Sequence, residues 1–148
     1  MASIWDESTR HQLLTRLDQL AADTPSRWGK FTCPGMLAHL NDSMRMPLGE
    51  LTPAPKHLPI RFFPLKQLII YVLPFPKGAP TAPELIARRE TAVWSGELQG
   101  FRELLGRLAA KPAAGPWPDH PAFGRMSRTD WGVLVYKHVH HHFTQFGG

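Results

Sequence analysis

Residues 131–146 read Trp131-Gly-Val-Leu-Val-Tyr-Lys-His138-Val-His-His-His142-Phe-Thr-Gln145-Phe. At about 100° per residue, one face of a helix over this stretch collects both its apolar side chains and most of its histidines. That face carries Trp131, Leu134, Val135, His138, His141, His142 and Gln145, whereas His140 points to the opposite side. Because a helix buries its apolar face, the pattern predicts a core helix that takes His138 and His142 inside.

Both ends of this helix are marked in the sequence. Ser127 and Asp130 have the spacing of a capping box with Ser127 at the N-cap, and Gly147 and Gly148 follow the last turn. An expression tag is an alternative origin for a terminal histidine run. Val139 interrupts the run, however, and the sequence continues beyond it to Phe146, so we assign the histidines to the fold itself.

Buried imidazoles need partners, because an unpaired polar group in a core costs free energy. One interpretation is a pair of core histidines that neighbouring groups satisfy by hydrogen bonding. The other is a metal site, since histidine is the commonest metal-ligating side chain and two histidines four residues apart can hold one ion. His141, three residues after His138, competes with His142 as the second ligand.

Three further helical segments precede the last one. The first covers about residues 4–22, with an apolar stripe of Leu13, Leu14, Leu17, Leu20 and Ala21. The second begins after the N-cap Thr32, carries an apolar face of Leu37, Leu40, Met44 and Leu48, and should kink or end at Pro47. The third covers about residues 91–109, where Trp94, Leu98, Phe101, Leu105 and Leu108 repeat at helical spacing.

Proline-rich segments separate these helices. Residues 53–83 hold eight of the fifteen prolines and form a long connection between the second and third helices. Within it, residues 64–73 form either a short buried helix or a strand, and we prefer the helix. A second proline-rich loop covers residues 111–121. The sequence therefore predicts an all-α helical bundle with one long crossover, a fold that builds metal sites from side chains on facing helices.

Composition narrows the class of protein. The 148 residues fit a single domain over 1–148, and the one cysteine, Cys33, allows no disulfide within the chain. The longest apolar run, residues 68–73, is far short of the roughly 20 residues that span a membrane, and no signal peptide is evident. The net charge of +5 comes from scattered residues without a nucleic-acid motif. We expect a soluble cytoplasmic protein that binds neither membranes nor nucleic acids.

A metal site needs a third ligand, because labile and catalytic ions usually have about three protein ligands and an open position. The remaining histidines are His11, His39, His57 and His120. His57 and His120 lie in proline-rich loops, and His11 lies near the start of the first helix. His39 lies at the margin of the apolar face of the second helix, so spacing alone leaves it open whether His39 is exposed or buried.

Two motifs resemble a known superfamily. The segment Thr32-Cys-Pro-Gly-Met-Leu-Ala-His39, followed later by His138-Val-His-His-His142-Phe-Thr-Gln145, resembles the pattern of the DinB/YfiT-like superfamily. More narrowly, the chain is similar to a bacterial DinB-like family of unknown function. That similarity is carried by Leu73-Pro-Phe-Pro-Lys-Gly-Ala-Pro-Thr-Ala-Pro-Glu-Leu85, His120-Pro-Ala-Phe-Gly, Trp131-Gly and Gln145-Phe-Gly, and it covers nearly the whole chain.

The resemblance implies an up-down four-helix bundle, with the long crossover between helices 2 and 3. It also implies a divalent ion, zinc, nickel or iron, bound by three histidines. Residue by residue, these ligands are His39, His138 and His142, with Gln145 placed to orient a ligand or a bound water. Pro47, shortly after His39, leaves the geometry of that helix open.

Two functions fit such a site. The first is a metal-dependent enzyme of small molecules, either a hydrolase or a transferase; the resemblance puts transfer of a low-molecular-weight thiol first. The second is a non-catalytic metal-binding or stress-response module. The catalytic residues remain unknown at this stage, and a homodimer is one expected assembly.

Five further residues are candidates for chemistry, each with an ordinary alternative. Asp42 and Asp130 are potential general bases, or else surface and capping carboxylates. Cys33 is a reactive thiol or a small buried hydrophobe. Arg45 and Lys77 would hold an anionic substrate or else lie in solvent.

Overall fold

The computed structural model describes residues 1–148 and contains helices but no strands. Its helices are α1 (Glu7–Leu17), α2 (Cys33–Arg45), α3 (Leu65–Gln67), α4 (Trp94–Ala110) and α5 (Arg128–Gln145). Three short helical turns, η1 (Pro59–Arg61), η2 (Leu68–Val72) and η3 (Pro83–Leu85), lie in the connection between α2 and α4. The predicted all-α class is confirmed.

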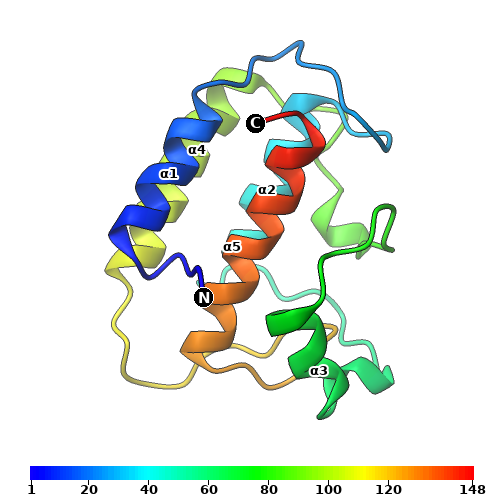
Figure 1. Ribbon diagram of the computed structural model, residues 1–148, viewed down its shortest axis with the longest axis vertical. Helices are drawn as coiled ribbons and strands as arrows, with labels where there is room; N and C mark the ends of the chain where they lie inside the picture. Colours follow the sequence, from blue (N-terminus) through cyan, green and yellow to red (C-terminus); the bar gives the residue numbers. More distant parts are fainter.

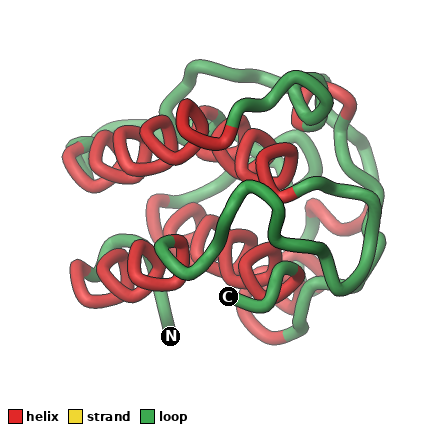
Figure 2. The backbone as a smooth tube through the Cα atoms, turned by 90° about the horizontal axis from the view of Figure 1, so that it is seen from above, coloured by secondary structure: helices red, strands yellow, loops and turns green.

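The four long helices lie side by side. α2 packs against α4 and α5, and α1 packs against α5. Figure 1 shows α1 beside α4, with α5 in front of α2. η2 packs against α5 and η3 against α2, so the connection covers one side of the α2–α5 pair. Figure 2 shows from above how the loops gather at one side of the helices.

The core is built from the predicted apolar faces. Twenty-six buried hydrophobic residues form one cluster. Each large side chain in such a cluster contributes about 1.5–3 kcal/mol relative to exposure. The long helices supply most of it: Leu13 and Leu17 from α1, Met36, Leu37, Leu40 and Met44 from α2, Phe101, Leu104, Leu105 and Leu108 from α4, and Trp131, Leu134, Val135, Val139 and Phe143 from α5.

Local sequence signals set the ends of α2 and α5. The Thr32 hydroxyl accepts a hydrogen bond from the Gly35 N–H at 3.1 Å, and α2 ends at Arg45, two residues before Pro47. At α5, the Ser127 hydroxyl and the Asp130 carboxylate each accept from the other's N–H at 3.0 Å, so the capping box is confirmed. His39 therefore lies inside α2 and well before the proline.

The first helix is shorter than predicted. α1 covers Glu7–Leu17 rather than residues 4–22. Beyond it, the Thr24 hydroxyl accepts from the Ala21 N–H at 2.8 Å, which replaces a helical bond. Before it, Ile4 is fully buried and its N–H donates to the Gly132 carbonyl at 3.2 Å, so the N-terminal residues pack against α5 instead of forming a helix.

Two other segments also differ from expectation. α4 begins at Trp94 rather than at residue 91, because Arg88 and Thr91 close a turn before it. Residues 64–73 are helical, as preferred, but the segment is not buried as a whole. Ile70 is buried, whereas Val72 is 67% exposed and Phe63, just before the segment, is 82% exposed. None of the helices has the length and apolar character required to cross a bilayer.

Candidate metal centre

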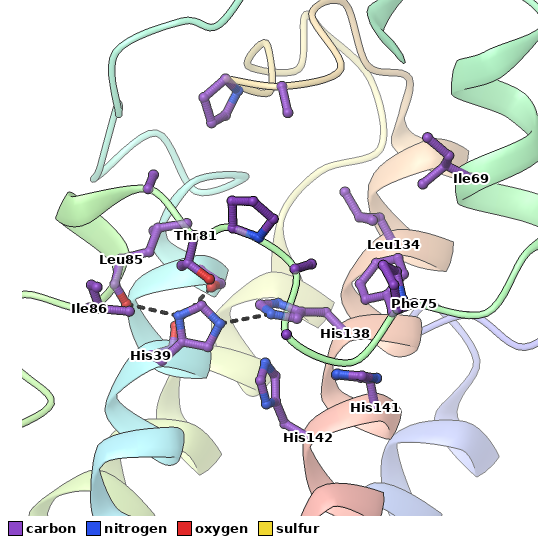
Figure 3. A pocket seen from close by; sticks show the side chains of 18 of the residues that line it. His39, Ile69, Phe75, Thr81, Leu85, Ile86, Leu134, His138, His141 and His142 are labelled. Carbon is purple, nitrogen blue, oxygen red and sulfur yellow. Dashed lines mark hydrogen bonds between the residues drawn. The ribbon is translucent and has the colours of Figure 1, made fainter. Parts of the chain in front are cut away.

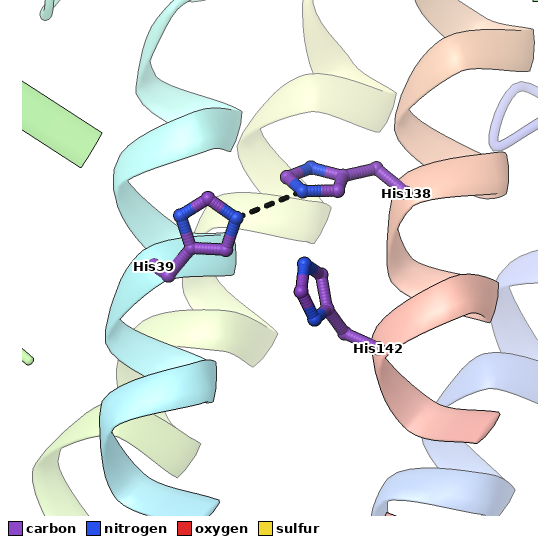
Figure 4. Close-up of side chains that lie close together, drawn as sticks. All are labelled: His39, His138 and His142. Carbon is purple, nitrogen blue, oxygen red and sulfur yellow. Dashed lines mark hydrogen bonds between the residues drawn. The ribbon is translucent and has the colours of Figure 1, made fainter. Parts of the chain in front are cut away.

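Three histidines from two helices meet between α2 and α5. His39 comes from α2, and His138 and His142 come from successive turns of α5, as Figure 4 shows. The ring centroids are separated by 4.7 Å for His39 and His138 and by 4.9 Å for each of the other two pairs. One nitrogen from each ring lies within 4.8 Å of the others. The three residues expected as ligands therefore form one compact, nearly equilateral cluster.

The orientation of His39 is fixed by the connection. Its Nδ1–H donates to the Leu85 carbonyl at 2.8 Å, and Leu85 belongs to η3. A carbonyl oxygen only accepts, so the proton of the neutral ring is on Nδ1 and the lone pair is on Nε2. That Nε2 lies 2.9 Å from His138 Nε2, the contact drawn in Figure 4. His39 thus presents a ligand nitrogen to the centre of the cluster.

His142 is oriented in the same way by a side chain of its own helix. The Gln145 Oε1 accepts from His142 Nδ1–H at 2.6 Å, while Gln145 Nε2 donates to the Trp28 carbonyl at 2.8 Å. The second bond fixes which end of the amide is which, so His142 also keeps its proton on Nδ1. Its Nε2 then points at the cluster. Such orienting bonds are typical of metal-ligating histidines.

A glycine makes room for this chain of hydrogen bonds. Gly29 has a positive φ of 79°, and a Cβ there would lie 2.8 Å from Gln145 Nε2. A side chain at this position would displace the amide, and the backbone conformation itself disfavours residues other than glycine. The loop before α2 therefore contributes to the position of His142.

Burial keeps all three rings neutral. Desolvation lowers the pKa of His39, lowers that of His138 well below its usual value, and lowers that of His142 to about 3. The neighbouring imidazoles reinforce the effect for His138 and His142. Metal binding requires the deprotonated form of histidine, so no pKa cost opposes binding near neutral pH.

The cluster opens into a pocket of about 1020 Å³. Figure 3 shows labelled walls from α2, α5 and the long connection, with the histidines at one end. The walls are mostly apolar, and Phe31, Phe75 and Leu134 are among them. The charged residues that line the pocket are Lys30, Lys56 and Arg89, and no aspartate or glutamate lines it. The hydrogen bonds of these histidines therefore go to the Leu85 carbonyl and the Gln145 amide, not to a carboxylate.

The arrangement suits a single divalent ion. Nitrogen ligands lie about 2.1 Å from zinc, which places neighbouring ligand nitrogens of one site about 3–4 Å apart. Three neutral imidazoles would leave the charge of the ion undiminished and a coordination position facing the pocket. The three-histidine cluster is thus compatible with metal binding.

The other histidines of the last helix are placed apart from the cluster. His141 lines the pocket beside His142, with ring centroids 5.0 Å apart, but is not among the three converging ligands. His140 is exposed on the other side of α5, where its Nδ1 lies 2.9 Å from Arg16, as its predicted direction requires. His11 and His57 are exposed, and His120 lines the pocket outside the cluster.

The two candidate general bases are not in the pocket. Asp130 caps α5 and also accepts from the Tyr71 hydroxyl. Asp42 is buried, so its reading as a surface carboxylate was wrong: it forms ion pairs with Arg45 at 2.5 Å and with Arg88 at 3.2 Å. Asp42 is one turn from His39 on α2, but it does not line the pocket, because its carboxylate is taken up by these two arginines.

The remaining three candidates for chemistry are Cys33, Arg45 and Lys77. Cys33 is buried, and burial raises the pKa of its thiol to about 12, which favours the small-hydrophobe interpretation. Arg45 pairs with Asp42. Lys77 is exposed, with its ammonium 4.4 Å from the centre of the Trp28 ring. None of the three lines the pocket.

Sequence reasoning missed the groups that orient the ligands. The carbonyls of Leu85 and Trp28 belong to the main chain, so residue types and their spacing could not predict these contacts. His120 was assigned only to a loop, although it lines the same pocket as the cluster. The signal that pointed to His120 was the motif His120-Pro-Ala-Phe-Gly, whose role the sequence left unexplained.

Comparison with protein families finds a match over most of the chain. The family model described as "Protein of unknown function (DUF1569)" matches residues 7–147. The chain belongs to this family, and the match includes all three clustered histidines. The search of curated proteins and the search of solved structures returned no match.

Proposed function

We propose that this member of DUF1569 binds one divalent metal ion through the Nε2 atoms of His39, His138 and His142. One observation carries the proposal. Two of the three rings have their Nδ1–H held by an acceptor outside the cluster, the Leu85 carbonyl and the Gln145 amide oxygen, so that their lone pairs converge.

We further propose that the long helices form an up-down four-helix bundle of the DinB/YfiT-like type. The observed helix order and the crossover between α2 and α4 support this arrangement. In helical bundles, metal ligands project inward from facing helices. The position of the cluster between α2 and α5 is of that kind.

Zinc, nickel and iron are the ions that we propose, because imidazole suits all three. Such an ion supplies Lewis acidity and lowers the pKa of a bound water or thiol. The chain itself contributes the three ligands and the two acceptors that hold their orientation. Its pocket walls are mostly apolar on the face of the site on which a substrate would bind.

The reaction that we place first is transfer of a low-molecular-weight thiol to a small-molecule acceptor. In such a transfer, the sulfur forms a bond to an electrophilic carbon, while the thiol proton and the leaving group depart. The pocket of about 1020 Å³ has room for both reactants. Hydrolysis at the same ligands is the alternative reaction, with water in place of the thiol.

The pocket also argues for an enzyme over a non-catalytic metal-binding or stress-response module. A structural metal site is closed by a fourth protein ligand, whereas a catalytic site keeps an open position. No cysteine, aspartate or glutamate completes the cluster, and the neighbouring space is pocket. We therefore rank the module second. A cytoplasmic location and a homodimer remain part of the proposal.

Metal analysis of protein purified without a histidine tag is the decisive experiment. We expect one ion per chain, with loss of the ion in variants that lack a ligand. If the purified chain and the chain incubated with zinc, nickel or iron both lack bound metal, the proposal is wrong. When metal is present, a screen of thiols for catalysed transfer separates the two functions, because a binding module would give no turnover.

A further inference from the structure

The motif His120-Pro-Ala-Phe-Gly124 forms a tightly closed turn at the edge of the pocket. His120 and Gly124 exchange two backbone hydrogen bonds, at 2.7 Å and 2.8 Å. Inside the turn, His120 Nδ1 accepts from the N–H groups of Ala122 at 3.0 Å and Phe123 at 3.2 Å. Gly124 closes the turn with a positive φ of 68°. The local structure therefore holds one imidazole in a single orientation.

These bonds also decide where the proton of His120 is. Because Nδ1 accepts, the neutral ring carries its proton on Nε2. Burial lowers the pKa of His120 to about 3, so the ring stays neutral near pH 7. No group of the protein accepts from Nε2, and His120 lines the pocket. The turn thus leaves an unused N–H donor in the pocket wall.

Lys56 is joined to the same turn. Its backbone N–H donates to the Pro121 carbonyl at 2.7 Å, and Lys56 lines the pocket as His120 does. Its ammonium group forms no ion pair with any carboxylate of the chain. A free cation and a neutral N–H donor thus stand on one small structural unit, in a pocket without acidic residues.

The position of this unit relative to the histidine cluster follows from α5. The His120 ring packs on Trp131, with centroids 5.4 Å apart. Trp131 precedes His138 by seven residues, which is about 10 Å along a helix. The space between is apolar, and Figure 3 shows Leu134 and Ile69 beyond His138, on the side away from His142.

We propose that the pocket binds an elongated, largely apolar substrate whose carboxylate is held by Lys56 and His120 Nε2–H, about 10 Å along α5 from the histidine cluster. The reactive end of that molecule lies at the proposed metal ion, so the inference rests on the proposed function. Its apolar body lies along the wall between the two ends. The substrate class is thus a medium-chain organic acid.

Binding of a matched pair of probes tests the inference. Mercaptooctanoate and mercaptooctanol share the thiol and the chain and differ in the carboxylate. Calorimetry on the metal-loaded protein should show the acid binding about tenfold more tightly than the alcohol, the size expected of a charge-assisted hydrogen bond. Equal affinities would overturn the proposal.

Three variants locate the effect. Lys56→Gln and His120→Asn should each reduce the affinity for the acid by about tenfold and leave that for the alcohol unchanged. Asparagine is chosen because its amide oxygen can accept from Ala122 and Phe123, so the turn is kept while the Nε2–H donor is lost. Lys30→Gln is the matched control, a cation of the same pocket outside the turn, and should change neither affinity. A preference for the acid that survives in both Lys56→Gln and His120→Asn would also overturn the proposal.

A last pair of probes separates this inference from the metal proposal. Should the chain prove to bind no metal, octanoate and octanol are compared on the protein as purified. A preference for octanoate that is lost in Lys56→Gln would then support the carboxylate site alone. The absence of any preference would reject it as well.

Discussion

α2 takes part in two clusters of polar side chains, which differ in how their members are paired. On one side, His39 joins His138 and His142 in a group of neutral rings without a carboxylate. On another, Asp42 and Glu97 surround Arg88, whose guanidinium lies 3.2 Å from Asp42 and 2.5 Å from Glu97. Asn41 adds a hydrogen bond to Glu97 at 2.7 Å. We refer to these as the histidine cluster and the ion-pair cluster.

The partners of the polar groups distinguish a candidate binding site from a structural contact. In the ion-pair cluster, every charged side chain faces an opposite charge of the protein. In the histidine cluster, the outward nitrogens of His39 and His142 are satisfied and the inward nitrogens face one another. The inward nitrogens of three neutral rings are thus compatible with a cation bound between them.

We expect the largest effect on metal content from the loss of one ligand of the histidine cluster. In His138→Ala, the metal content should fall from one ion per chain to background, because two ligands do not hold an ion against solvent at ordinary concentrations. Elemental analysis of untagged protein measures it. His140→Ala is the matched control, since His140 is on the same helix but exposed on its other side, and should retain the ion. Equal metal in both variants would refute the site.

A substitution in the ion-pair cluster should lower the stability of the protein and leave its metal content unchanged. Arg88→Met leaves Glu97 without a charged partner and Asp42 with Arg45 alone, and we expect a loss of about 2 kcal/mol in unfolding free energy. This figure is set below that for a fully buried pair because the Arg88 side chain is 40% exposed. Urea denaturation followed by circular dichroism measures the change. Metal content should not move; a loss of metal in this variant would show that the two clusters are coupled.

The pH dependence should separate the clusters in the metal-free protein. The folded pKa of His142, about 3, lies below the unfolded value of about 6.5, so folding favours the neutral ring. The contribution of His142 to the free energy of unfolding is fully present above pH 6.5. It decreases as the pH falls, by about 2 kcal/mol at pH 5. Urea midpoints between pH 7 and pH 5 measure this loss, which should shrink in His142→Gln. A variant with the wild-type slope would contradict the assignment.

The ion-pair cluster should respond only at lower pH. Burial alone would raise the pKa of Glu97, but hydrogen bonds from Arg88 and Asn41 outweigh it, and the pKa is lowered from 4.5. The contribution of Glu97 is therefore present above about pH 4.5 and lost below it as the carboxylate is protonated. In Glu97→Gln, the slope between pH 7 and pH 5 should match that of the wild type.

The smallest expected effect concerns the orientation of one ligand. In Gln145→Ala, His142 loses the acceptor of its Nδ1–H, and metal affinity should fall by about tenfold. Competition with a chromophoric chelator measures it. Gln145→Glu is the informative control, because a carboxylate still accepts from His142 and should retain more of the affinity than alanine does. If alanine has no effect, the hydrogen bond does not orient the ligand.

The sequence predicted the parts of this molecule that depend on residue type at fixed spacing. The direction of each histidine on α5 follows from helical periodicity, and the capping box of Ser127 and Asp130 is a local pattern. The burial of His39 did not follow, because it depends on how the connection folds back so that Leu85 covers the ring. The same is true of Asp42, whose partner Arg88 is 46 residues away. Contacts across long connections are set by the tertiary fold.

The two backbone carbonyls that orient the ligands limit what mutagenesis of side chains can detect. Trp28 and Leu85 act on Gln145 and His39 through main-chain oxygens that every amino acid possesses. Replacing either side chain removes no hydrogen bond from the site, so an alanine scan would report the core packing of Leu85 and the ring contact of Trp28 with His141 but not the two hydrogen bonds. One-residue insertions or deletions in the flanking loops, or ester substitution of the backbone, would reveal them instead. The part of each residue that orients a ligand is therefore its backbone, which side-chain substitutions do not test.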